Sequence, residues 1–141
     1  MNRRSLLALL GLGAAAVPAL AQQKKSAAKQ RVIFQVSDND PARWNLALNN
    51  ARNVQTDLGK DNVQIEIVAY GPGIEMMKAE SKVAGGLAGA LDSSVGLIAC
   101  ENTMHNTKVT RDDMYAGIAY VQAGVTHIMK RQQERWAYIR P

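Results

Sequence analysis

Short runs of strand-forming residues alternate with helix-periodic segments along most of this 141-residue chain, and this alternation constrains its fold more than any other feature. The expected strands cover residues 31–36, 63–70, 95–100, 118–121 and 136–139. The expected helices cover residues 41–58, 82–91 and 123–135, with brief helical turns at 74–78 and after Thr110. Because strands separated by helices pair in parallel, we expect an α/β domain with a mainly parallel five-stranded sheet and helices on both faces.

The helix expected over residues 41–58 has clear signals at both ends. Asp40 can accept hydrogen bonds from the first free amides, and Pro41 suits the first helical position because no N–H is needed there. Gly59 can adopt the left-handed backbone that ends many helices. One face of this segment is apolar at helical spacing and should pack on the sheet, through Trp44, Ala47, Leu48, Ala51, Val54 and Leu58.

The carboxyl ends of parallel strands meet at one edge of the sheet, and ligands of open α/β sheets bind there at a topological switch point. This edge should bring together four segments that are distant in the sequence: Ser37–Asn39, Tyr70–Gly73, Cys100–Thr103 and Gln122–Gly124. The Gly-Pro-Gly turn after Tyr70 should stop the second strand and present backbone amides to the same edge.

Cys100 is the only cysteine of the chain, so no disulfide can form within it. It ends an apolar strand and enters the polar segment 101–109, for which we expect a loop and a sulfur near the surface. Helix N-termini gathered at this edge carry partial positive charge, which favours a thiolate. Such a thiolate could attack a disulfide, accept sulfane sulfur as a persulfide or bind a soft metal. The alternative is a small, inert core residue.

Histidines and acidic residues near this edge have assignments of their own. His105 follows Cys100 by five residues and could serve as a base or a metal co-ligand. His127 lies in the middle of an expected helix, and we assign it to the surface. Thr110 and Asp113 have the spacing of a capping box, which predicts a brief helix. Asp112 and Asp113 then complement its dipole as first-turn charges rather than form a catalytic pair.

Several methionines raise the alternative of a copper site. Three of them are left over after the expected core faces are assigned: Met76, Met104 and Met114. Met77 and Met129 instead belong to core faces. A copper site would combine the three with Cys100 and His105, although their spacing does not define one. The chain has no phosphate loop, dinucleotide fingerprint, nucleophile elbow or zinc-type cysteine pair, so we expect no cofactor and no resident metal.

Residues 1–21 have the three parts of a secretory signal peptide: a positively charged start, an apolar run and an Ala-Leu-Ala cleavage motif ending at Ala21. The run is shorter than a spanning helix requires, so we expect no stable membrane anchor. Paired Arg3 and Arg4 leave both the general and the twin-arginine export routes open. Either route would deliver a periplasmic or secreted protein.

The mature chain should begin with a disordered polar leader over residues 22–30, followed by one folded domain over residues 31–141. Loss of the two signal arginines lowers the net charge from +5 to +3, and three lysines in the leader account for that remainder. The folded part is therefore near neutral. No basic stripe interleaved with aromatic residues occurs, so we expect no nucleic-acid partner.

Four short segments resemble the DsrE/DsrF-like family, and in particular its small exported members. They are Val68–Gly73, Ala99–Met104, Ala123–Val125 and Trp136–Pro141. The most specific of them is the C-x-N-T-M motif that starts at Cys100. The likeness extends over residues 31–141, which is the whole expected domain.

This resemblance implies a flavodoxin-like three-layer sandwich and a homo-oligomer, either a trimer or a hexamer. It also implies that Cys100 carries sulfur as a persulfide between thiol-bearing partner proteins. Our leading hypothesis is therefore a sulfur-handling protein of the cell envelope in which Cys100 is the catalytic residue. The expected binding residues at the same edge are Asn39, Tyr70, Gly71, Gly73, Asn102, Thr103 and His105.

Two other functions stay open. One is a non-enzymatic oligomeric module that binds a small ligand or copper at the Cys100 edge. The other is a structural role in which the thiol is inert.

Overall fold

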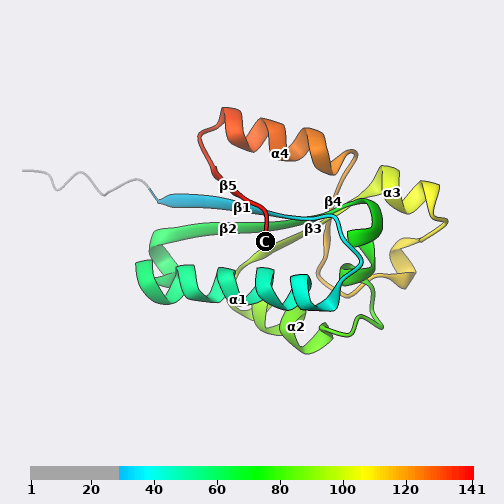
Figure 1. The fold of residues 1–141 in the computed structure, drawn as a ribbon, viewed down its shortest axis with the longest axis horizontal. Helices are drawn as coiled ribbons and strands as arrows, with labels where there is room; N and C mark the ends of the chain where they lie inside the picture. Colours follow the sequence, from blue (N-terminus) through cyan, green and yellow to red (C-terminus); the bar gives the residue numbers. More distant parts are fainter. Residues whose placement is uncertain (1–28) are drawn as a thin grey trace, which may run out of the picture.

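The computed structural model describes residues 29–141, which fold into a parallel sheet between two layers of helices (Figure 1). The strands are β1 (Gln30–Val36), β2 (Val63–Ala69), β3 (Gly96–Cys100), β4 (Ala119–Val121) and β5 (Ala137–Ile139). The α-helices are α1 (Pro41–Leu58), α2 (Ala84–Asp92), α3 (Glu101–Asn106) and α4 (Gly124–Gln133). Short 3-10 helices are η1 (Lys60–Asn62), η2 (Gly71–Met77) and η3 (Arg111–Asp113).

The described strands form one five-stranded parallel sheet in the order β4-β3-β2-β1-β5. Helices α1 and α2 cover one face and α4 covers the other, as Figure 1 shows. This confirms the predicted α/β class and fits a flavodoxin-like three-layer sandwich. The chain runs from β1 to β4 in one direction across the sheet, and α4 then returns it to β5 on the far side of β1.

Side chains alternate between two unequal cores because successive strand residues face opposite sides of the sheet. Phe34, Ile67 and Leu97 face α1 and α2 and belong to the larger core. The smaller core lies beneath α4 and consists of Ile33, Val68, Ile98, Ile128 and Trp136. The faces of the sheet are therefore buried by very different amounts of helix.

The boundaries of α1 are those that the sequence predicts. Asp40 accepts a hydrogen bond from the Ala42 amide at 2.9 Å, and Gly59 ends the helix with a φ of +89°. Trp44 is buried on the inner face together with Ala47, Leu48 and Ala51. Leu58 is an exception, because it is 40 % exposed at the last turn.

Other expectations need correction or fall outside the description. Residues 101–106 form α3 rather than a loop, because Met104 packs this turn into the larger core. Met129 is 51 % exposed on α4 instead of lying in the core. The capping box of Thr110 and Asp113 is present as expected at η3.

The export signal of residues 1–21 and nearly all of the expected leader lie outside the described residues, and Gln30 already belongs to β1. Within residues 29–141, every helix is too short or too polar to cross a bilayer.

Candidate functional site

Cys100 is the last residue of β3 and immediately precedes α3. Its side chain is on the α4 side of the sheet, because it lies two residues beyond Ile98 of the smaller core. It is only 5 % exposed, so the expectation of a sulfur near the surface is wrong. The helix that replaces the expected loop accounts for this, since α3 folds its first turn directly over the strand end.

Cys100 lies at a topological switch point, where the connections that follow two neighbouring strands leave toward opposite faces of the sheet. From β3 the chain enters α3, whose Met104 packs in the larger core. From the neighbouring β4 it enters α4, whose Ile128 packs in the smaller core on the opposite face. Adjacent strands whose connections leave toward opposite faces open a crevice between their carboxyl ends, where α/β proteins bind ligands.

Hydrogen-bond donors from both connections surround the sulfur. Burial raises the pKa of the Cys100 thiol. The Gly124 amide lowers that pKa, and so do the hydroxyl and amide of Thr103 and the amide of Asn102. The donors prevail, and the pKa of the thiol lies below its ordinary value. The groups that lower this pKa are backbone amides and a hydroxyl rather than a neighbouring cation.

Thr103 links Cys100 to the turn after β2. Its hydroxyl oxygen accepts a hydrogen bond from the Gly71 amide at 2.9 Å. Because this bond occupies the oxygen as an acceptor, the hydroxyl proton is free to point at the sulfur. Gly71 has a φ of +54°, which explains the glycine at this position of the turn. Two of the predicted binding residues thus act together at Cys100.

Gly73 supports the same turn by a close backbone approach. A Cβ at this position would lie 2.3 Å from the Val36 carbonyl oxygen. The turn can therefore pack against the end of β1 only if residue 73 has no side chain. Gly73 positions the donors at Cys100 without touching the sulfur itself.

Gln122 belongs to the predicted edge but was not among the expected binding residues. Its carbonyl oxygen accepts a hydrogen bond from the Cys100 thiol at 3.8 Å and another from the Asn102 amide at 3.0 Å. Its side-chain amide donates to the Asn102 side chain. These bonds tie the first turn of α3 to the residue after β4. Its place at the end of a strand was the signal in the sequence, although its role depends on tertiary contacts.

Tyr70 lies at the same edge but on the side toward β1 and β5. Burial raises the pKa of its hydroxyl, and the adjacent Tyr138 adds to this, while Arg140 and Ser37 act in the opposite direction. Its ring packs closely against the start of α4, since a Cβ on Gly124 would lie 3.3 Å from the Tyr70 Cδ1. Tyr70 therefore forms one wall of the strand-end cluster.

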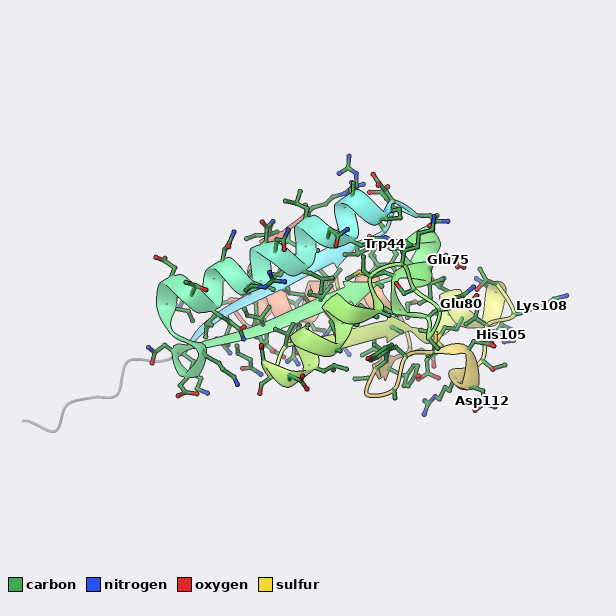
Figure 2. The ribbon with its side chains drawn as sticks, turned by 90° about the horizontal axis from the view of Figure 1, so that it is seen from below. Trp44, Glu75, Glu80, His105, Lys108 and Asp112 are labelled. Carbon is green, nitrogen blue, oxygen red and sulfur yellow. The ribbon has the colours of Figure 1, made fainter. Side chains whose placement is uncertain are left out.

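The remaining predicted binding residues lie apart from the sulfur. Asn39 borders a separate cavity of about 410 Å³ near Trp44 and Glu75, on the α1 side of the sheet (Figure 2). His105 is exposed in the last turn of α3 (Figure 2). Within residues 29–141, no hydrogen bond connects His105 with Cys100, so the structure does not bring this predicted pair together.

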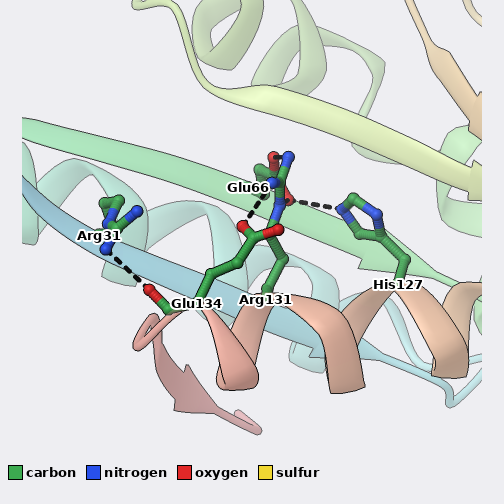
Figure 3. A network of polar contacts seen from close by, with 5 residues as sticks. All are labelled: Arg31, Glu66, His127, Arg131 and Glu134. Carbon is green, nitrogen blue, oxygen red and sulfur yellow. Dashed lines mark hydrogen bonds and ion pairs between the residues drawn. The ribbon is translucent and has the colours of Figure 1, made fainter.

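A second polar cluster lies beneath α4 and corrects the assignment of His127 to the surface (Figure 3). Glu66 of β2 is 6 % exposed, and its carboxylate accepts a hydrogen bond from His127 Nε2 at 2.7 Å. Arg131 donates to both Glu66 oxygens, at 2.7 and 3.1 Å, and its other terminal nitrogen bonds Glu134. These hydrogen bonds raise the pKa of Arg131. The cluster attaches α4 to the centre of the sheet.

The three methionines considered for copper binding are all buried. Met76, Met104 and Met114 pack in the larger core as ordinary apolar side chains. In the described part of the chain, no group of three His, Cys, Asp or Glu residues is arranged to hold a metal ion.

Two solved structures share this architecture. A protein of unknown function from Methanobacterium thermoautotrophicum, MTH1491, superposes with a TM-score of 0.77 at 37 % identity, over 80 % of this chain and 100 % of that chain. A conserved protein of unknown function from Bacteroides thetaiotaomicron, BT1422, gives a TM-score of 0.61 at 14 % identity, over 79 % and 95 % of the two chains, and shares the fold. No protein-family model matches the sequence, and no curated protein matches it.

Proposed function

We propose that this chain, which belongs to the same family as the Methanobacterium thermoautotrophicum protein MTH1491, is a DsrE-like sulfur carrier with Cys100 as its sulfur-accepting residue. One observation carries the proposal: the buried Cys100 thiol ends β3 at the carboxyl edge of the sheet, where three backbone amides and one hydroxyl lower its pKa. An inert core cysteine needs no such donors. A thiolate is the form of cysteine that attacks sulfane sulfur.

The loading step balances without an external oxidant or reductant. The Cys100 thiolate attacks the outer sulfur of thiosulfate, the sulfur–sulfur bond of thiosulfate breaks, and sulfite leaves with the electron pair. The product is a Cys100 persulfide. In the discharge step a second thiolate attacks the outer sulfur, the persulfide bond breaks, and Cys100 leaves as a thiolate.

Intact mass tests the proposal directly. After incubation with thiosulfate or polysulfide, the chain should gain the mass of one sulfur atom and lose it again on treatment with a reductant. Cys100→Ser should gain nothing. A wild-type chain without a sulfur adduct, or an adduct that persists in Cys100→Ser, would rule the function out.

Export and assembly belong to the same proposal. We propose that the signal expected over residues 1–21 directs the carrier to the periplasm or out of the cell. The family resemblance suggests a homo-oligomer of three or six chains that serves thiol-bearing partners. Fractionation of cells that express the full chain measures its location. Light scattering on the exported form then measures the number of chains in the oligomer.

A further inference from the structure

A groove of about 340 Å³ runs between β4 and α4, on the face of the sheet that Cys100 also faces. Its lining residues are Val121, Gln122, Ala123, Thr126, His127 and Lys130. Val121 pairs with Cys100 across the two strands, and the carbonyl of Gln122 lies 3.8 Å from the sulfur. The outer sulfur of a persulfide lies about 2 Å beyond the cysteine sulfur. One end of the groove is therefore built from the immediate neighbours of Cys100.

His127 presents a defined nitrogen to this groove. Its Nε2 carries a proton, because the ionised carboxylate of Glu66 can only accept. In the neutral ring Nδ1 then has a free lone pair. Among residues 29–141, Nδ1 has no hydrogen-bond partner, and Nε1 of Trp136 is the one fully buried side-chain nitrogen or oxygen without a partner. Because His127 lines the groove and Nε2 is bonded to Glu66, Nδ1 is the nitrogen that is available to a ligand there.

The charges around His127 leave one cation uncompensated. Glu66 of β2 is paired with Arg131, and Arg131 is also paired with Glu134. From β1, Arg31 donates to the Glu134 carbonyl oxygen. Lys130 lines the groove and has no ion pair with any of the described residues. The groove therefore offers one free ammonium, one proton-accepting nitrogen and an apolar floor.

We propose that this groove binds a low-molecular-weight thiol that carries a carboxylate, with the carboxylate on Lys130 and the thiol proton on His127 Nδ1. The inference rests on the proposed function, because the bound thiol is the acceptor of the sulfur held on Cys100. The thiol proton moves to Nδ1, and the resulting thiolate attacks the outer sulfur of the Cys100 persulfide. The persulfide bond breaks, Cys100 leaves as a thiolate, and the acceptor departs as a persulfide.

Discharge of the loaded chain by cysteine and by cysteamine tests the role of Lys130, since the two thiols differ in the carboxylate. Cysteine should discharge the wild type about fivefold faster than cysteamine, and 0.5 M salt should reduce the difference. Lys130→Gln should abolish it, whereas Lys60→Gln, at the opposite end of the sheet, should retain it. Equal rates for the two thiols on the wild type, or an unchanged preference in Lys130→Gln, would overturn the proposal.

The pH profile tests His127. The variant His127→Gln keeps a donor for Glu66 but has no basic nitrogen. At pH 6.5 it should discharge about tenfold more slowly than the wild type, because only a small fraction of a free thiol is ionised there. At pH 9.5 the two rates should converge, because the thiol ionises without help. Slowing by the same factor at both pH values would indicate a structural role and refute proton transfer.

A binding measurement separates this proposal from the sulfur-carrier function. If Cys100 cannot be loaded, the carrier function fails, but the groove can still be examined on the unloaded chain. S-methylcysteine should shift the amide resonances of Thr126, His127 and Lys130, and Lys130→Gln should weaken that binding. The absence of any shift at these residues would overturn the groove as a thiol site.

Discussion

At the scale of single residues, Thr103 contributes to the ionisation of the Cys100 thiol, after burial and the Gly124 amide. Its hydroxyl and amide both lower the pKa of the thiol. We predict that Thr103→Val raises the pKa of Cys100, so that the thiolate fraction at neutral pH falls. The rate of alkylation by iodoacetamide should fall several-fold at pH 7, and the midpoint of its pH profile should move upward. Thr107→Val, one turn further along, should leave the midpoint unchanged, and an unshifted midpoint in Thr103→Val would contradict the assigned donor.

Gly73 and Gly89 provide a matched pair of substitutions to alanine. At Gly73 a Cβ would meet the Val36 carbonyl oxygen at 2.3 Å, whereas at Gly89 in α2 it would enter open space. Gly73→Ala should destabilise the chain by about 3 kcal/mol or more, because backbone must move. Gly89→Ala should stabilise it by about 0.5–1 kcal/mol, because glycine is a poor helix former. Urea unfolding measures the change in the free energy of unfolding for each variant. Similar changes in Gly73→Ala and Gly89→Ala would show that the turn at Gly73 is looser than described.

The ion pair between Glu66 and Arg131 holds α4 to the sheet at the scale of elements. Arg131→Met leaves the buried Glu66 carboxylate with His127 alone and should cost about 2–4 kcal/mol of unfolding free energy. Adding Glu66→Gln should recover part of this loss, since the uncompensated charge is then removed. Glu134→Gln breaks the exposed bond of Arg131 and should change stability little. A double variant less stable than Arg131→Met would contradict this account.

Elements were predictable from sequence where local signals agree with tertiary packing. Asp40 and Gly59 mark the ends of α1 because capping depends on neighbours along the chain. The short helix α3 was missed because six polar-rich residues have no periodicity of their own, and its packing through Met104 decides it. His127 was misplaced because its partner Glu66 is 61 residues away.

In the candidate site, too, features that depend on contacts between distant parts of the chain could not be predicted from the sequence. Cys100, Thr103 and Gly71 were predictable because the strand order of an α/β sheet brings its carboxyl ends together. The contribution of Gln122 was not, since it depends on the hydrogen bonds that join α3 to the end of β4. The burial of the sulfur also follows from that junction rather than from the residues beside it.

At the scale of the whole molecule, the two faces of the sheet are covered by hydrophobic cores of very different size. The α1 and α2 face is filled by a large continuous cluster, whereas the α4 face has five buried apolar residues. The edge strand β5 pairs with β1 over three residues, and all three of the β5 residues are exposed. The donors and lining residues contributed by α4, including Gly124 and His127, therefore belong to the less deeply packed side of the sheet. This arrangement suits a site that must admit and release a ligand.

Hydrogen exchange in the native state should show this difference directly. Amides of α4 and β5 should exchange through a partial opening that costs less free energy than global unfolding, while those of β1, β2 and α1 should require global unfolding. Arg131→Met should lower the free energy of opening at α4 beyond its effect on α1, because the Glu66 pair resists separation of α4 from β2. The amides of α1 in the same sample serve as the reference. Exchange of α4 and α1 with the same free energy would mean that the two layers open together, and the smaller core would then be as cooperative a part of the fold as the larger one.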